Sequence, residues 1–141
     1  MGNGHHLYHF SNQNQKITPV PPGVHGLSNH FLNTPWPKVT TGKKALAWAI
    51  HADNLTPETL FDLLSDSSHP PDHLLPDTGV GLEWEQLLSP MFIKSPSYGT
   101  RSSVVMCITS QGEIQVTERT YFQDKIPRIP SHKDRYFSFF P

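Results

Sequence analysis

The sequence predicts an α+β fold in which antiparallel strands lie near both ends of the chain and helices lie between them. Segments typical of strands occur before residue 30 and after residue 100. Between these two groups, apolar residues recur at helical spacing. The chain has 141 residues, enough for one domain with a modest core.

Three short strands are expected at the amino end. Residues 5–11 alternate, with Tyr8 and Phe10 on one face, and a polar turn follows them. Residues 15–20 can pair back onto this first strand. After a Pro-Pro-Gly turn, residues 24–28 are expected to form a third strand.

The middle of the chain is expected to be helical. Residues 33–37 contain two prolines and predict a rigid, non-helical connection. Residues 43–53 carry a broad apolar stripe, which predicts an amphipathic helix. A second helix should begin at Thr56, since threonine caps helices and Pro57 suits the first helical position. Its buried stripe would contain Leu60, Phe61 and Leu64.

A proline-rich loop is predicted for residues 65–81, followed by a short helix over residues 83–88. Pro90 should end that helix.

The carboxyl end is expected to return to strands. Residues 104–108 are apolar at every position, which predicts a strand covered on both faces. A turn at residues 110–112 leads into a strand over residues 113–122. On that strand we expect Ile114, Val116 and Phe122 to point inward, and Gln115, Thr117 and Arg119 to point outward.

The last part of the chain contains a predicted loop over residues 124–133 and an aromatic strand over residues 136–140.

The first group of strands is too thin to be stable by itself, because a sheet of two or three strands is marginal without further packing. We therefore expect this group to need partner strands from elsewhere. This is a first indication, from the residues alone, that the fold is incomplete.

Charge and composition exclude several partner classes. The net charge is −1, so no strong field would attract nucleic acid or an anionic membrane surface. No stretch approaches the roughly 18 apolar residues of a membrane span. The single cysteine, Cys107, allows no intrachain disulfide, which agrees with a reducing, cytoplasmic location.

Several segments resemble the NRDE-motif family, which includes the transport and Golgi organisation proteins. They are GVHGLSNHFLNTPWPKV at residues 23–39, LPDTGVGLEWEQLLSPMFI at 75–93, YGTRSSVV at 98–105 and VTERTYF at 116–122. Family members begin with Met-Cys and carry an early Asn-Arg-Asp-Glu motif. This chain begins with Met-Gly and has no such motif. The resemblance therefore implies that residues 1–141 are the C-terminal part of a family domain whose N-terminal half is absent.

The resemblance also implies an N-terminal-nucleophile-hydrolase-like scaffold, in which two sheets lie between helical layers (αββα). In that class the first residue after processing attacks an amide carbonyl, and its free amine handles the proton. Gly2 has no side chain, so removal of Met1 would expose no nucleophile. We expect no catalytic residue in this chain alone, and no amide hydrolysis by it.

Four residues are candidates for a substrate or oxyanion site. By similarity to the scaffold class, Asn29 could donate its amide N–H to an oxyanion, or it could simply cap a turn. Arg101 could orient a carboxylate, or it could form an ion pair with Glu118. Tyr98 and Ser102 are neighbouring candidates whose alternative role is packing or turn formation.

The sequence gives no reason to expect a metal or another cofactor. Cys107 lies inside an apolar segment, where cysteines are usually inert. His5 and His9 share a predicted strand face, but His6 points away and no second ligand pair accompanies them.

Three functions remain open. The first is that the chain is an inactive part of a hydrolase-like domain that is completed by a complementary polypeptide. Family resemblance also points to binding or trafficking of a hydrophobic ligand such as haem. The third reading is a non-catalytic interaction module that recruits partners through exposed strand edges.

Overall fold

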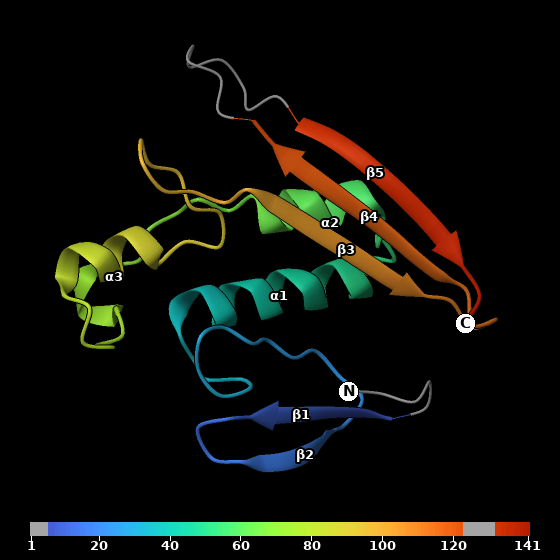
Figure 1. The fold of residues 1–141 in the computed structure, drawn as a ribbon, viewed down its shortest axis with the longest axis horizontal. Helices are drawn as coiled ribbons and strands as arrows, with labels where there is room; N and C mark the ends of the chain where they lie inside the picture. Colours follow the sequence, from blue (N-terminus) through green and yellow to red (C-terminus); the bar gives the residue numbers. More distant parts are fainter. Residues whose placement is uncertain (1–5, 123–131) are drawn as a thin grey trace.

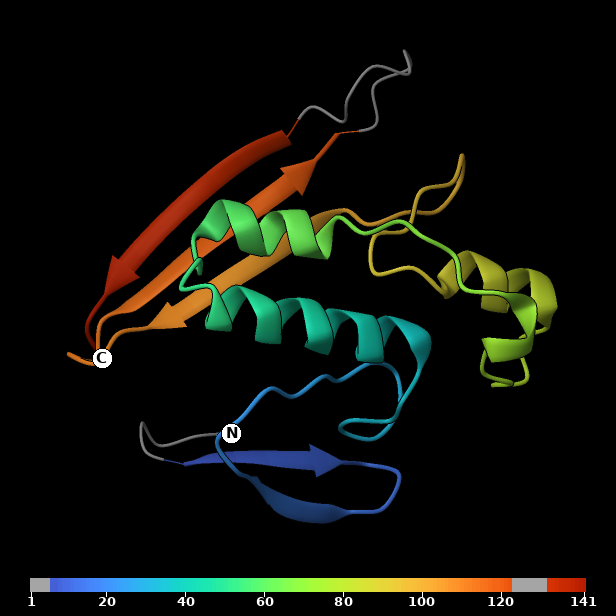
Figure 2. The same cartoon turned by 180° about the vertical axis from the view of Figure 1, so that it is seen from behind.

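A computed structural model describes residues 6–122 and 132–141 and has the predicted α+β class, with antiparallel sheets and helices (Figure 1). The elements come in the order β1 (Leu7–Ser11), β2 (Lys16–Val20), α1 (Pro37–His51), α2 (Pro57–Leu64), α3 (Leu82–Leu88), β3 (Ser102–Ile108), β4 (Ile114–Tyr121) and β5 (His132–Phe139). The strands β1 and β2 form a hairpin, and the last three strands form a sheet in the order β3-β4-β5. In both views, α1 lies between the hairpin and the larger sheet (Figures 1 and 2).

The first two predicted strands are confirmed. β1 spans Leu7–Ser11 and β2 spans Lys16–Val20, paired antiparallel from Leu7 opposite Val20 to Ser11 opposite Lys16. The prediction of a third strand over residues 24–28 is wrong, because these residues form no strand. The Gly26 carbonyl instead accepts a hydrogen bond from the Asn33 N–H at 2.7 Å, and this bond closes a local loop.

Helix α1 spans Pro37–His51 and begins six residues earlier than predicted. Pro37 occupies its first turn, where a proline loses no helical hydrogen bond and its fixed φ suits the helix. Gly42 lies within the helix, and a Cβ added there would lie 3.0 Å from the Met91 sulfur. The glycine thus lets the segment after α3 pack closely against α1.

Helix α2 confirms its sequence prediction. It spans Pro57–Leu64, and the Thr59 N–H donates to Thr56 Oγ1 at 3.2 Å as an N-cap bond. The predicted loop that follows contains one short 3-10 helix, Asp72–Leu74, and α3 spans Leu82–Leu88.

The larger sheet contains β3 (Ser102–Ile108), β4 (Ile114–Tyr121) and β5 (His132–Phe139), all antiparallel. Each strand was expected, but β5 begins four residues before the predicted start of the aromatic strand. The predicted loop over 124–133 lies mostly outside the described residues, and its last two positions belong to β5.

The predicted orientation of this sheet is wrong. Arg119 was expected to point outward, yet it is buried on the face that packs against α2. Residues 104–108 were expected to be covered on both faces, yet Val104, Met106 and Ile108 are 54%, 62% and 63% exposed. Helices cover only one face of the sheet within the part of the chain that the structure describes, so every second apolar residue faces outward.

The core lies between the helices and the covered face of the sheet (Figure 2). Phe61 of α2 is its most buried large side chain, and the Arg119 guanidinium lies 4.2 Å from the centre of its ring. Phe92 packs edge-on against Tyr121 at 4.7 Å between ring centres. The other buried apolar residues are Val39, Ala49 and Val105.

Candidate functional site

A cleft of about 730 Å³ lies beside the free edge of β3. Its walls come from α1, α2, the strand β3 and the segments 25–29 and 88–93. Most of its lining is aliphatic or methionine, with residues such as Leu46, Leu60 and Met91. The polar lining residues are His25, Ser28, Asn29, Lys38, Lys43 and Tyr98.

Asn33 fixes the wall of the cleft formed by segment 25–29. Its side-chain oxygen accepts from the Gly26 N–H at 3.0 Å and from Lys43 Nζ at 2.8 Å. Its amide nitrogen lies 2.9 Å from His25 Nδ1. Asn33 also adopts a φ of 62°, a left-handed conformation that asparagine tolerates better than most residues. Sequence reasoning missed this residue, although Asn before Thr-Pro is a turn signal.

Two of the predicted site residues meet at this cleft. Asn29 lies on an exposed bend and Tyr98 is 48% exposed, and both line it. The Tyr98 ring packs edge-on against Trp84, with 6.2 Å between ring centres. Its backbone is held by Ser95, whose hydroxyl donates to the Tyr98 carbonyl at 2.6 Å. Tyr98 is therefore a positioned aromatic residue at the cleft wall.

The other two predicted residues do not line the cleft. Arg101 is exposed, and its carbonyl accepts from the Tyr121 N–H at 2.9 Å. Ser102 is exposed at the start of β3, opposite Thr120. The alternative ion pair between Arg101 and Glu118 is absent from the described part of the chain.

Arg119 forms the ion pairs instead. It donates to both carboxylate oxygens of Glu58, at 3.0 and 2.8 Å, and to both oxygens of Asp134, at 2.9 and 2.8 Å. These hydrogen bonds lower the pKa of both carboxyl groups and raise that of the guanidinium. The cluster joins α2, β4 and β5, away from the cleft lining, and is structural.

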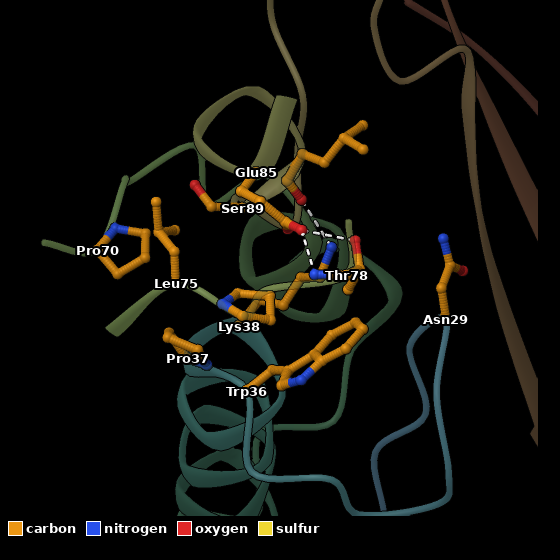
Figure 3. A pocket seen from close by; sticks show the side chains of 11 residues that line it. Asn29, Trp36, Pro37, Lys38, Pro70, Leu75, Thr78, Glu85 and Ser89 are labelled. Carbon is orange, nitrogen blue, oxygen red and sulfur yellow. Dashed lines mark hydrogen bonds between the residues drawn. The ribbon is translucent and has the colours of Figure 1, made fainter. Parts of the chain in front are cut away.

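A second, smaller pocket of about 110 Å³ shares Asn29, Lys38 and Leu88 with the cleft (Figure 3). Its polar wall is built around Glu85, which is 7% exposed. One Glu85 oxygen accepts from the Thr78 N–H at 2.7 Å and from the Thr78 hydroxyl at 2.6 Å. The pocket thus places the Glu85 carboxylate beside the cleft, among apolar residues such as Trp36 and Leu75.

Lys38 is the cation shared by the two cavities. Its Nζ donates to the Leu88 carbonyl at 2.7 Å, which holds the side chain against the segment after α3. Burial lowers the pKa of Lys38, and the negative charge of Glu85 partly opposes that change. The amine is therefore easier to deprotonate than an exposed lysine.

The structure places His25 in the cleft wall and Cys107 in the larger sheet. His25 lines the cleft, but its Nε2 lies 2.9 Å from the Pro21 carbonyl and its Nδ1 contacts Asn33. Cys107 is half-buried on the helix-facing side of β3. Within residues 6–122 and 132–141, no cluster of three or more His, Cys, Asp or Glu could hold a metal ion. His5 lies outside these residues.

The size and lining of the cleft would suit an amphipathic or apolar molecule. The large cleft offers apolar contacts, while Asn29, Lys38 and Lys43 could meet a polar group at its margin. Among the described residues that line the cleft, no nucleophile lies at hydrogen-bond distance from a base, the arrangement that covalent acyl transfer uses.

Comparison with known proteins identifies the family of this chain. The sequence model for the family Transport and Golgi organisation 2 matches residues 1–123. The chain belongs to this family. A human Transport and Golgi organization protein 2 homolog is 30% identical over 109 residues, covering 72% of this chain and 40% of the human protein. A Bos taurus homolog of the same name is 28% identical over 128 residues, covering 81% of this chain and 45% of the relative.

As a member of the Transport and Golgi organisation 2 family, the chain spans less than half the length of the curated relatives it matches. The matched region includes the whole cleft lining and ends close to β4. None of the helices within residues 6–122 and 132–141 is long and apolar enough to cross a membrane.

Proposed function

We propose that this chain is the ligand-binding part of a Transport and Golgi organisation 2 domain, built on an N-terminal-nucleophile-hydrolase-like scaffold. It holds a hydrophobic small molecule, such as haem, in the cleft beside β3. The supporting observation is the cleft itself. Its volume of about 730 Å³ and its aliphatic lining suit a small apolar ligand, because such sites typically measure about 300–1,000 Å³.

The polar margin of the cleft gives the ligand an orientation. Asn29 and Lys38 lie where the cleft meets the small pocket, so the polar end of a ligand would point there. Aliphatic residues of α1 and α2 would contact its apolar body.

This binding function is tested with two hydrophobic anions, the fluorescent fatty acid cis-parinaric acid and haemin. Leu46→Trp would place a bulky ring in the cleft and is expected to weaken saturable binding at least about tenfold, the effect of losing about 1.4 kcal/mol. Leu82→Trp is the matched control, since Leu82 lies on α3 outside the cleft lining and is 55% exposed. Equal binding by both variants, each folded by circular dichroism, would refute the cleft as the site.

Titration with haemin distinguishes a site that binds a tetrapyrrole through its iron from a site that binds apolar molecules in general. Iron ligation by His25 would require its ring to leave Pro21 and Asn33. A Soret shift that disappears in His25→Ala identifies ligated haem. A shift that His25→Ala leaves unchanged means that haemin binds by apolar contact alone.

We also propose that the domain is completed by a complementary polypeptide that carries a Cys nucleophile and the Asn-Arg-Asp-Glu motif. The support is the share of the relatives' length that this chain spans, together with Asn29 and Tyr98 at the cleft, where they could contact a substrate. Co-expression with the unmatched part of the human relative is expected to yield a complex with amidase activity, while the chain alone has none. A folded complex that cleaves no amide would remove the hydrolase proposal and leave the binding proposal standing.

Two further proposals concern a second candidate function and the location of the chain in the cell. The exposed edge of β3 favours an interaction module as the second candidate function, since free edges recruit strands. The single cysteine supports a cytoplasmic location, which imaging of a tagged full chain would test.

A further inference from the structure

Lys38 holds its amine at the junction of the cleft and the small pocket. Its Nζ donates a hydrogen bond to the Leu88 carbonyl at 2.7 Å, which gives the amine a fixed position. Lys38 lines both cavities, and Figure 3 shows its side chain in the small pocket together with Glu85. Within residues 6–122 and 132–141 it forms no ion pair, because the ion pairs there belong to Arg119. The amine is therefore positioned beside two cavities without a neutralising contact.

The surroundings of Lys38 favour a neutral amine. Burial lowers the pKa of Lys38, and the negative charge of Glu85 opposes only part of that change. Lys38 also lies in the first turn of α1, which contains no acidic residue. The backbone N–H groups of a first helical turn carry partial positive charge and disfavour a further cation nearby. The neutral amine is the form of lysine that attacks a carbonyl carbon.

The other ionisable groups around Lys38 leave its amine available. Those that line a cavity together with Lys38 are His25, Lys43, Asp66, His69, Glu85 and Tyr98. In the described part of the chain, none of them forms a hydrogen bond or an ion pair with Lys38. The Glu85 carboxylate is fixed by two hydrogen bonds from Thr78, and its charge acts on Lys38. It would stabilise a cation formed at Lys38 Nζ.

We propose that Lys38 is a covalent attachment site for an aliphatic aldehyde whose chain lies in the cleft. This inference rests on the proposed binding function and names the reactive group of the ligand. The lone pair of the amine attacks the carbonyl carbon, and a C–N bond forms while a proton moves from nitrogen to oxygen. Loss of water from this carbinolamine gives a C=N bond. One amine and one aldehyde thus yield one imine and one water, and no oxidant or reductant takes part.

The geometry accommodates both the reagent and the product. One hydrogen of the neutral amine can remain on the Leu88 carbonyl while the lone pair reacts. The protonated imine keeps a single N–H, which can donate to the same carbonyl, and the Glu85 carboxylate balances its charge. Aliphatic residues of the cleft, such as Leu46 and Leu60, would contact the alkyl chain.

The test is a reaction of the full chain with decanal and sodium cyanoborohydride, which reduces an imine to a stable secondary amine. After limited reaction at neutral pH, peptide mass spectrometry measures the rate of labelling at each lysine. Lys38 is expected to react at least about tenfold faster than Lys44, which is exposed on the same helix.

Two matched variants assign the reaction to one side chain. Lys38→Arg keeps the positive charge but forms no imine, so the fast labelling should disappear. Lys44→Arg is the control and should be labelled as fast as the unsubstituted chain. Circular dichroism checks that each variant is folded. The comparison of Lys38 with Lys44 uses the unsubstituted chain, so it decides the inference even where a variant does not fold.

The outcomes separate this inference from the proposed function. Equal labelling of Lys38 and Lys44 would overturn the inference and leave non-covalent binding in the cleft standing, because cis-parinaric acid measures that binding. Fast labelling of Lys38 that Leu46→Trp leaves unchanged would place the alkyl chain outside the cleft and would also overturn the inference. If Leu46→Trp also fails to weaken the binding of cis-parinaric acid, the proposed function fails with it.

Discussion

At the scale of single residues, Arg119 shows how a charged side chain can belong to a core. Its planar guanidinium covers the Phe61 ring and makes two bidentate contacts, with Glu58 and Asp134. An outward position was predicted because charged residues are rarely buried without partners. The two carboxylates come from α2 and β5, which are far from Arg119 in sequence, so the partners could not be foreseen from β4 alone.

We expect Arg119→Met to lower the free energy of unfolding by about 1–2 kcal/mol, because it removes the contact with Phe61 and the hydrogen bonds. The loss stays moderate because Glu58 and Asp134 remain solvated, at 66% and 38% side-chain exposure. Urea unfolding measures the change. Arg101→Met, at an exposed arginine, is the control and should alter stability by less than about 0.5 kcal/mol.

The same cluster predicts an acid dependence. The hydrogen bonds from Arg119 hold the pKa of Glu58 and of Asp134 below their ordinary values of 4.5 and 3.8. Both carboxylates therefore stabilise the fold above those values, and this contribution disappears as the pH falls through their lowered pKa. Unfolding free energy measured from pH 6 to pH 2 should decline less steeply in Arg119→Met. Parallel curves for the two proteins would contradict the assignment.

At the scale of the elements, α1 and α2 begin for different reasons, since only α2 has a side-chain cap. Thr56 with Pro57 marked the start of α2 correctly, since the cap is a local interaction. Pro37 was read as part of a rigid connection, yet it occupies the first turn of α1. Proline is compatible both with a rigid connection and with the first turn of a helix. The packing of the residues that follow Pro37 therefore determines that the helix begins there.

Removing the cap of α2 should destabilise the protein. Thr56→Ala loses the bond from the Thr59 N–H and is expected to cost about 1 kcal/mol of unfolding free energy. Thermal unfolding followed by circular dichroism is the measurement. Thr41→Ala, at an exposed position inside α1, should be neutral or slightly stabilising, because alanine is the better helix former.

At the scale of the whole molecule, the two faces of the larger sheet differ in what they contribute to stability. Val105 is 6% exposed and packs toward the helices, whereas Phe137 is 53% exposed on the face that points away from them. In this chain by itself, Val105→Ala should cost about 1–3 kcal/mol through lost burial. Phe137→Glu should cost less than about 1 kcal/mol, within the range of strand preferences.

Chemical denaturation of the two variants checks this contrast. A large loss in Phe137→Glu would mean that another part of the chain covers this outer face of the sheet in solution. Equal, small losses in both variants would mean that Val105 is not in a packed core.

The sequence by itself determined the α+β class, the strands β1 to β5, the cap of α2 and the family, because alternation, capping and motif order are local properties. Tertiary structure alone decided which sheet face is covered, where Arg119 finds its partners, and that Asn29 and Tyr98 share a cleft while Arg101 and Ser102 do not. The physical reason is that burial and pairing join residues distant in sequence. The alternation of apolar and polar residues indicates that the two faces of a strand differ. Only the elements that pack against the strand determine which face is buried.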